Sequence, residues 1–329
     1  MNPVLVEILR GDRVESFHRG AAVVCDASGQ MLDSRGDVGR AIYPRSALKP
    51  LQCLPLVAGG AADSLGLTDA EIALACGSHS GEPVHVAAVE ALRRKAGRDD
   101  SCLECGVHWP LGEKAARELA ARGGGPTPLH NNCSGKHAGF ICLAVHGGLD
   151  PTSYVRHDHP VMREVTAAVA AATGARLDDS CRATDGCSIP AFAVPLESLA
   201  TGFARLGTGD RLDDPLARAT ARIRRAVAGN PWAVAGEGRF DSRIMEACGG
   251  AVLSKCGAEG VAAAAIPAAG IGLAVKIDDG AGRAAEVAMA ALLRRFLSRP
   301  LADHPALEAL ADVVLTNWNG LTVGRIRPC

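Results

Sequence analysis

The sequence predicts an α+β fold, in which one antiparallel sheet built from the two ends of the chain is covered by helices. Three observations lead to this prediction: strand-like segments lie near both ends of the 329 residues, the middle has a largely helical pattern, and no repeat or low-complexity linker divides the chain. We therefore expect a single domain over residues 1–329, with a sheet formed by about 1–35 and 265–329.

The N-terminal part contains four short apolar segments separated by turn residues. The expected strands are residues 4–9, 14–17, 20–25 and 31–34. The last two strands are joined by Asp26-Ala27-Ser28-Gly29, a composition typical of a tight turn.

The middle of the chain carries the apolar spacing of amphipathic helices. The expected helices are residues 82–96, 113–121, 137–146, 160–173 and 215–228. The C-terminal part returns to strands. Residues 271–277 are predicted as a strand that turns into a helix at 282–297, and Asn319-Gly320 joins strands at 313–316 and 321–326.

Composition excludes several classes of protein. The 35 basic and 36 acidic residues nearly cancel, so charge indicates neither a nucleic-acid partner nor an acidic membrane surface. Glu7 interrupts the first apolar residues too early for a secretory signal, and the longest apolar run, 261–275, is broken by proline and glycine. We expect a soluble, cytoplasmic protein whose twelve cysteines are mostly reduced thiols.

Ser46 and Lys49 form a Ser-x-x-Lys motif at the start of a predicted helix. A hydroxyl is a weak nucleophile at neutral pH, and a neutral amine one helical turn away can take its proton. The apolar segment 50–56 favours burial of Lys49, which is the condition under which a lysine loses its proton. A solvated surface pair is the alternative, because this spacing also arises by chance.

A second cluster spans residues 75–82, Ala-Cys-Gly-Ser-His-Ser-Gly-Glu. Glycine and serine at a strand-to-helix junction would expose Ser78 to a pocket, where backbone N–H groups can bind an anion. Ser80 is expected to cap the helix that follows. The two interpretations are compatible.

Two polar, glycine-containing turns carry the better candidates for metal ligands. Cys133 lies in the segment 130–140 and Cys187 in the segment 184–190. Two thiolates do not complete a tetrahedral zinc site, and His137 is the ordinary choice for a third ligand. Two unrelated loop cysteines are an equally open interpretation.

Cys102 and Cys105, with His108, form a competing group that has the commoner C-x-x-C spacing. This group lacks a second pair of ligands, so a surface turn is the favoured interpretation. Further along, Lys255-Cys256-Gly257 is similar to the Lys-Thr-Gly element of serine penicillin-recognising enzymes, where a lysine on a strand edge points into the site.

Together these motifs resemble the asparaginase II family, the rhizobial-type or class 3 L-asparaginases. The resemblance rests on Ser46-x-x-Lys49, Cys76-Gly77-Ser78-His79-Ser80-Gly81, Asn131-Asn132-Cys133-Ser134-Gly135-Lys136-His137, Asp185-Gly186-Cys187 and Lys255-x-Gly257-Ala258-Glu259-Gly260. It runs nearly end to end, from Glu15-Ser16-x-His18-x-Gly20 to Asn317-Trp318-Asn319-Gly320.

The resemblance implies hydrolysis of L-asparagine to L-aspartate and ammonia, on a fold similar to serine β-lactamases and glutaminases, by a homodimer. It implies two catalytic tandems, Ser46 with Lys49 and Ser78 with Lys255. Ser46 would attack the side-chain amide, and water would hydrolyse the acyl-enzyme.

The resemblance also implies that Zn²⁺ is held by Cys133, Lys136 and Cys187 with a water, so that Lys136 replaces His137 as third ligand. Lysine binds a metal only when it is neutral, and zinc can displace that proton. For the charged ends of the substrate we expect Arg45 and Lys255 to bind the carboxylate and Asp185 to bind the amine. His79 is expected to contribute to the same substrate site.

Two other functions are considered. One is a related glutaminase or β-lactamase-like acyl hydrolase, which would share the Ser-Lys groups. Enzymes of these classes resemble this chain only in the Ser-x-x-Lys and Lys-x-Gly elements, which argues against this function. A non-catalytic sensor of zinc or amino acids would bind without turnover. Retention of both lysines disfavours a sensor, because binding alone does not need buried amines.

Overall fold

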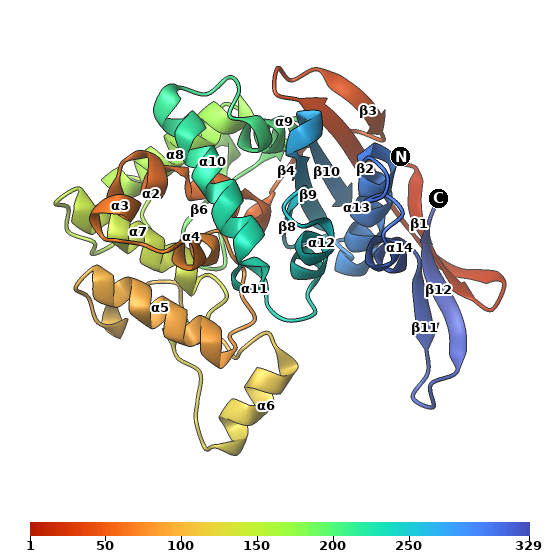
Figure 1. Cartoon of the computed structure of the whole chain (residues 1–329), viewed down its shortest axis with the longest axis horizontal. Helices are drawn as coiled ribbons and strands as arrows, with labels where there is room; N and C mark the ends of the chain where they lie inside the picture. The colour runs from red at the N-terminus through yellow and green to blue at the C-terminus, as the bar shows by residue number, and fades with distance from the viewer.

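The computed structural model describes residues 1 to 329 and confirms the α+β fold. An antiparallel eight-stranded sheet has the order β11-β12-β1-β2-β10-β9-β8, and β3 pairs with β2 (Figure 1). Its strands are β1 Val4–Arg10, β2 Arg13–Asp26, β3 Met31–Arg35, β8 Leu253–Cys256, β9 Val261–Ile266, β10 Ile271–Ile277, β11 Val313–Thr316 and β12 Thr322–Pro328. Both ends of the chain contribute, as the sequence predicts.

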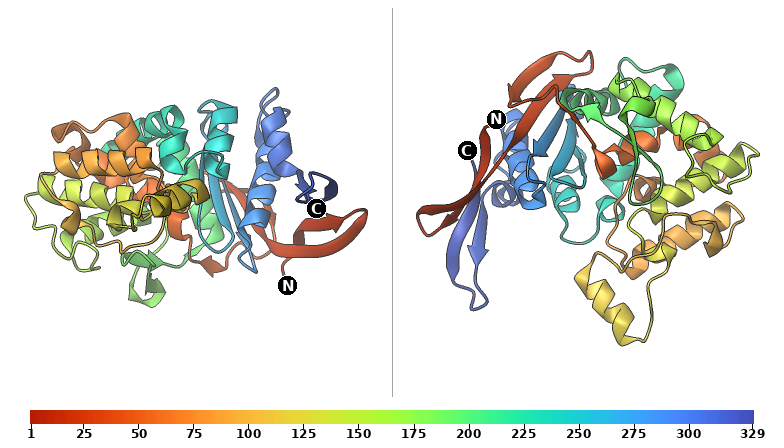
Figure 2. Two further views of the ribbon diagram at one scale, coloured as in Figure 1. Left: turned by 90° about the horizontal axis from the view of Figure 1, so that it is seen from below. Right: turned by 180° about the vertical axis from the view of Figure 1, so that it is seen from behind.

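Helices cover both faces of this sheet (Figure 2). Helix α9 packs on β2 and β10 from one side, and α13 packs on β9 and β10 from the other. The helices are α1 Lys49–Gln52, α2 Leu54–Ala58, α3 Ala61–Ser64, α4 Asp69–Ala75, α5 Pro83–Lys95, α6 Glu113–Ala121, α7 Ser134–His146, α8 Pro160–Thr173, α9 Leu196–Thr208, α10 Asp214–Gly229, α11 Pro231–Val234, α12 Phe240–Cys248, α13 Gly282–Phe296 and α14 Pro305–Ala311. None of them is both long enough and apolar enough to cross a membrane.

Two pairs of short strands lie outside the large sheet. Strand β4 (Ala41–Ile42) pairs with β7 (Val194–Pro195), and β5 (Arg182–Thr184) pairs with β6 (Pro190–Phe192). The second hairpin carries the segment that contains Asp185 and Cys187.

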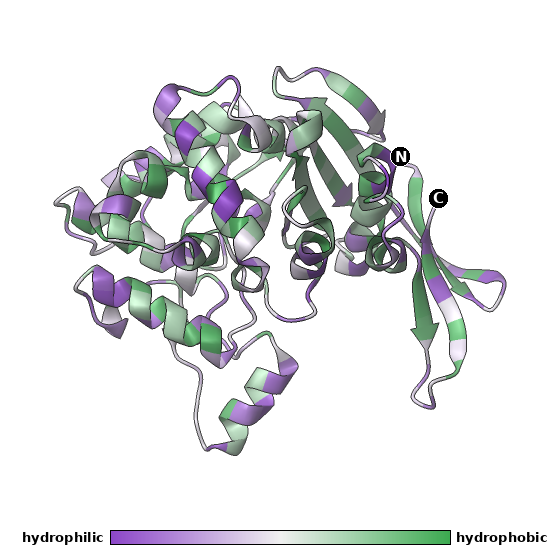
Figure 3. Ribbon diagram, in the orientation of Figure 1, coloured by the Kyte–Doolittle hydropathy of each residue, from purple (hydrophilic) through white to green (hydrophobic).

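The central strands are buried on both faces. Along β2, Val23 belongs to an apolar core of 58 buried residues that joins the helical layer to one face of the sheet. The next residue, Val24, belongs to a core of 30 buried residues beneath α12, α13 and α14. Successive side chains of a strand point to opposite faces, so both faces need apolar residues. Figure 3 shows the resulting apolar colour of the central strands.

The sheet is larger than the sequence indicates. Residues 14–17 and 20–25 form one strand, β2, because Gly20 marks a close approach of β10 instead of a break. An added Cβ at Gly20 would lie 2.3 Å from the carbonyl oxygen of Lys276. Strand β8 and most of β9 lie before the predicted 265–329 segment, and they complete the sheet.

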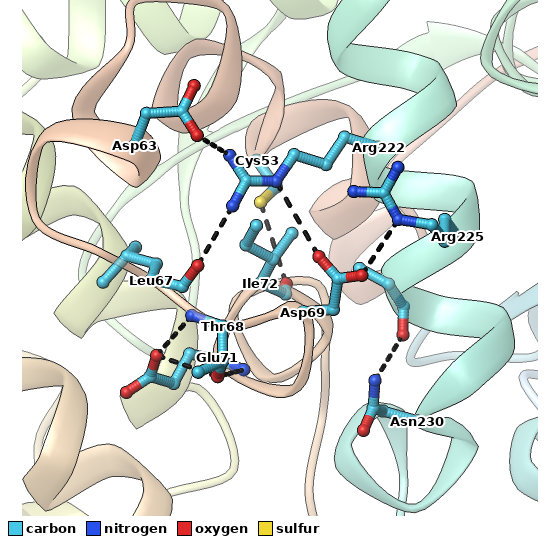
Figure 4. A network of polar contacts seen from close by, with 11 residues as sticks. Cys53, Asp63, Leu67, Thr68, Asp69, Glu71, Ile72, Arg222, Arg225 and Asn230 are labelled. Atoms are coloured by element: carbon cyan, nitrogen blue, oxygen red, sulfur yellow. Dashed lines mark hydrogen bonds and ion pairs between the residues drawn. The ribbon is translucent and has the colours of Figure 1, made fainter.

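A network of polar contacts fixes α4 against α10 (Figure 4). Arg222 of α10 pairs with Asp63 and donates to the carbonyl oxygen of Leu67 at 3.0 Å. Arg225 pairs with Asp69, the first residue of α4, at 3.0 Å. Because α4 ends at Ala75, just before the segment that contains Ser78, this network helps to place the candidate site.

Candidate active site

Ser46 and Lys49 lie where a 3₁₀ turn (Arg45–Leu48) passes into α1. Ser46 is half-buried, whereas Lys49 is only 1% exposed. The amine of Lys49 contacts the carbonyl oxygen of Gly77 at 2.7 Å, Ser78 Oγ at 2.9 Å and the carbonyl oxygen of Asn132 at 3.3 Å. The Lys49 amine donates to the two carbonyls and to the Ser78 hydroxyl, and when it is neutral its lone pair can accept from that hydroxyl instead.

The hydrogen bonding within the two expected tandems differs from the sequence-based prediction. The side chain of Lys49 contacts Ser78, and the hydroxyl of Ser46 makes no hydrogen bond within the protein. Only the backbone N–H of Lys49 reaches back, to the carbonyl oxygen of Ser46. Side chains three residues apart lie on the same face of a 3₁₀ turn, so the turn does not separate Ser46 from Lys49; the Lys49 amine contacts Ser78 and two backbone carbonyls instead.

Burial lowers the pKa of Lys49 to about 8. The thiols of Cys133 and Cys187 oppose this shift, and the positive charges of Lys136 and Lys255 add to it. Removing an ammonium from water disfavours its charged form, so Lys49 has the property that a general base requires.

Ser78 lies between two helices, α4 and α5, and not at the expected strand-to-helix junction. Its backbone N–H donates to the carbonyl oxygen of Val234 at 2.7 Å. Gly77 is required beside it, because an added Cβ would lie 2.5 Å from the carbonyl oxygen of Ala233. The expected cap is also different: Ser80 donates to the carbonyl oxygen of Ala235, and Glu82 takes the N-cap position of α5.

His79 is fully buried, and both of its ring nitrogens have partners inside the protein. Its Nδ1 accepts from the backbone N–H of Gly81 at 3.1 Å, and its Nε2 lies 2.8 Å from Ser134 Oγ. Burial holds the pKa of His79 well below its usual value, so the ring is neutral. These contacts make His79 a link between the Ser78 segment and the start of α7, and leave no ring nitrogen facing a substrate.

Arg45 and Asp185 form a two-pronged ion pair. Arg45 Nε donates to Oδ2 and Nη2 to Oδ1 of Asp185, both at 3.0 Å. The backbone of Arg45 has a φ of 52°. Ser188 and Glu259, which lie in two other segments identified by the sequence motifs, also have a positive φ. Residues other than glycine are strained in this left-handed backbone conformation, and such strained residues are frequent at functional sites.

The segments expected to hold a metal come together. Lys136, in the first turn of α7, lies with its amine 3.1 Å from Cys187 Sγ. A hydrogen bond with Cys187, followed by the charges of Lys49 and Lys136, lowers the pKa of the Cys133 thiol well below its usual value despite burial. The same contact raises the pKa of Cys187, so this pair of thiols loses one proton readily and the second with difficulty.

The structure separates the alternative ligands from this cluster. No group of three or more His, Cys, Asp or Glu side chains is placed to hold a metal anywhere in the chain. His137 therefore does not join the two thiols, and its Nδ1 lies 2.6 Å from the hydroxyl of Tyr154. Cys102 and Cys105 likewise form no three-ligand group with His108.

Lys255 reaches the site from β8. It is 1% exposed and donates to the carbonyl oxygen of Cys256 at 2.8 Å. The end of β8 packs on the turn that carries Ser46: an added Cβ at Gly257 would lie 2.3 Å from the carbonyl oxygen of Pro44. Lys255 therefore enters the same region as Lys49, although it makes no hydrogen bond to Ser78.

A recess of about 370 Å³ opens beside Arg45. Its polar lining residues are Arg40, Tyr43, Arg45, Thr184, Glu259 and Lys276. It presents both positive and negative side chains, as a pocket for a zwitterion requires. Sequence reasoning did not identify Arg40 or Lys276, because neither lies in a recognisable motif.

Sequence reasoning also missed the backbone groups that hold Lys49. The carbonyls of Gly77 and Asn132 lie within segments that were identified, but no sequence pattern shows where a carbonyl points. Asp241, which forms an ion pair with Lys255 at 3.5 Å, was missed too. It lies 14 positions before Lys255 and outside every motif, so only the fold brings the two together.

Several solved structures align with most of this chain. A β-lactamase (Mb2281c) from Mycobacterium bovis aligns over 89% of this chain and 94% of its own, with 14% identity and a TM-score of 0.41. A putative β-lactamase from Bacteroides dorei aligns over 79% of this chain and 87% of its own, with 14% identity and a TM-score of 0.40.

Mglu, solved in its tris and glutamate form, aligns over 90% of this chain with 14% identity and a TM-score of 0.37. This chain spans 63% of the length of Mglu. These values describe a partial likeness of architecture and say nothing of substrate. No curated protein sequence matches this chain.

The family comparison is of a different kind, because it covers almost the whole chain. The model of the L-asparaginase II family matches residues 6–328, which include every segment of the candidate active site. The protein therefore belongs to the L-asparaginase II family.

Proposed function

We propose that the protein hydrolyses L-asparagine to L-aspartate and ammonia by a serine and lysine mechanism. Membership of an amidohydrolase family supports the reaction type. The observation that carries the mechanism is the buried amine of Lys49, 2.9 Å from Ser78 Oγ and three residues after the accessible Ser46. A desolvated lysine beside hydroxyl groups is the arrangement that nucleophilic catalysis by serine requires.

Ser46 is the proposed nucleophile, because it is accessible while Ser78 is buried. Its oxygen bonds to the side-chain amide carbon of asparagine, and its proton passes to the neutral Lys49 amine, with Ser78 as the relay. The C–N bond then breaks, and ammonia leaves with that proton. Water attacks the resulting ester, which releases aspartate, and a proton of that water restores the hydroxyl of Ser46.

The recess that Arg45 lines is the proposed binding place for the substrate backbone, and Asp185 lies outside its lining, bound to Arg45. Arg45 and Asp185 use only part of their hydrogen-bonding capacity on each other: Arg45 Nη1 stays available as a donor, and each carboxylate oxygen can accept again. The pair can therefore bind the carboxylate and the amine of an amino acid while remaining paired. This keeps both expected roles, in one rigid unit.

Cys133, Lys136 and Cys187 are the proposed zinc ligands. Cys187 contacts both the amine of Lys136 and the thiol of Cys133, and two thiols with a nitrogen donor and a water as fourth ligand fit the tetrahedral coordination of zinc. The thiols and Asp185 raise the pKa of Lys136 although burial opposes them, so binding must displace its proton. Bound zinc would supply a positive charge and hold the Cys133 and Cys187 turns together.

The test is an assay of ammonia release from L-asparagine and L-glutamine, with zinc content measured on the same sample. We expect turnover of asparagine and its loss in Ser46→Ala, with an unchanged unfolding curve. Preference for glutamine would favour the glutaminase alternative, and hydrolysis of a β-lactam alone would favour a β-lactamase-like enzyme. Binding of asparagine without any release of ammonia would contradict the proposal and favour a sensor.

A further inference from the structure

Lys255 has one counter-charge, Asp241, and both are buried. Lys255 is 1% exposed and Asp241 is 3% exposed, and Nζ lies 3.5 Å from Oδ2. No other carboxylate lies within ion-pair distance of Lys255. A buried ammonium is costly unless it is paired, and Asp241 is the partner that the fold provides.

Asp241 also holds the strand on which Lys255 lies. Its Oδ1 accepts from Ser254 Oγ at 2.8 Å, and both of its oxygens accept from the backbone N–H of Cys256 at 2.9 Å. Asp241 therefore contacts the residues on either side of Lys255 as well as Lys255 itself.

The position of Asp241 is fixed by a separate helix. It lies in the first turn of α12, where the positive end of the helix dipole stabilises a carboxylate. The residue after β8, Gly257, packs on the carbonyl oxygen of Pro44 at the turn that carries Ser46. Asp241 of α12 therefore contacts β8, and the residue after β8 contacts the turn that carries Ser46.

We infer that Asp241 is a positioning residue that pairs with the Lys255 amine and holds it beside the turn that carries Ser46, so that Lys255 binds the substrate carboxylate and does not act as a base. This inference rests on the proposed amidohydrolase function and deepens it. It divides the two lysines: Lys49, which has no carboxylate partner, moves the proton, whereas Lys255, which has one, supplies permanent charge.

Arginine separates the two possible roles of Lys255, because a guanidinium stays charged and cannot act as a base. We expect Lys255→Arg to keep ammonia release well above that of Lys255→Met. If Lys255 were a base, both variants would be equally inactive. Equal loss in the two variants, with unchanged unfolding curves, would overturn the inference.

Asp241→Asn tests the positioning role. We expect KM for asparagine to rise about tenfold or more, with a smaller change in kcat, because a paired charge that binds substrate is lost. The double variant with Lys255→Arg should recover part of this loss, since arginine needs no carboxylate to stay charged. An unchanged KM in a folded Asp241→Asn protein, or a loss confined to kcat, would refute the inference.

The matched control is Asp33→Asn, which removes a carboxylate from an ion pair with Arg295 at 2.9 Å on β3, away from the candidate site. It should leave KM unchanged. A calorimetric titration with L-aspartate gives a readout without turnover: affinity should fall in Asp241→Asn and not in Asp33→Asn. If the wild-type protein binds aspartate but releases no ammonia, the proposed function is wrong. The calorimetric comparison of the two variants then still decides the role of Asp241.

If Asp241→Asn does not fold, the comparison of Lys255→Arg with Lys255→Met decides alone. A wild-type protein that neither releases ammonia nor binds aspartate would overturn both the proposed function and the inference. An active wild-type protein with unaffected variants would overturn only the inference.

Discussion

Gly257→Ala should disable the site without touching any catalytic group. The new Cβ would lie 2.3 Å from the carbonyl oxygen of Pro44 and 3.3 Å from the backbone nitrogen of Ala47, whereas ordinary contact begins at 3.4 Å. Both neighbours are backbone atoms of the turn that carries Ser46, so they cannot rotate away. The end of β8 and this turn must separate by about 1 Å, and a shift of that size can lower turnover about 100-fold.

Overpacking of this kind costs about 1–3 kcal/mol of unfolding free energy, and the reduced freedom of the unfolded chain offsets about 0.4–1 kcal/mol of it. We would measure ammonia release and urea unfolding on the same preparations. Gly282→Ala is the control, because an added Cβ there, in the first turn of α13, meets nothing within 4 Å. A Gly257→Ala protein with wild-type turnover would refute the idea that packing between β8 and the Ser46 turn sets the geometry.

Two further predictions concern protons and metal. Burial lowers the pKa of Lys49 to about 8, so the neutral fraction of this amine grows from about a tenth at pH 7 to about nine tenths at pH 9. Turnover should therefore rise through this range. A rate that is flat from acid to alkaline pH would exclude Lys49 as the base. Purified protein should carry about one zinc per chain, lost in Cys133→Ser and in Cys187→Ser but kept in Cys102→Ser, as measured by elemental analysis. Zinc kept in Cys187→Ser and lost in Cys102→Ser would contradict the ligand assignment.

Local sequence signals were sufficient to predict the bounds of elements whose ends are marked by proline or glycine. The helix α8 begins with Pro160 at its first position and ends before Gly174 in the left-handed conformation, and its predicted bounds match the structure. Strand β9, Val-Ala-Ala-Ala-Ala-Ile, was not predicted because alanine favours helices. It becomes a strand only because β8 and β10 pair with it on either side, which is tertiary information.

The same division holds in the candidate site. The sequence predicted which segments carry chemistry, and the structure brings Lys49, Ser78, Lys136 and Cys187 into one buried region. The sequence did not predict the hydrogen-bond partners of Lys49. Spacing along a helix cannot show that its amine contacts Ser78 and two backbone carbonyls from distant segments. The pairing of Lys255 with Asp241 was hidden for the same reason.

The most direct test of the mechanism is to identify the serine that carries the acyl group. Protein mixed with L-asparagine and quenched rapidly in acid would be digested, and the peptides would be mapped by mass spectrometry. We predict an aspartyl ester on Ser46, absent from Ser46→Ala and still formed in the control Gly282→Ala. An ester on Ser78, or full turnover with no acylated serine, would contradict the account.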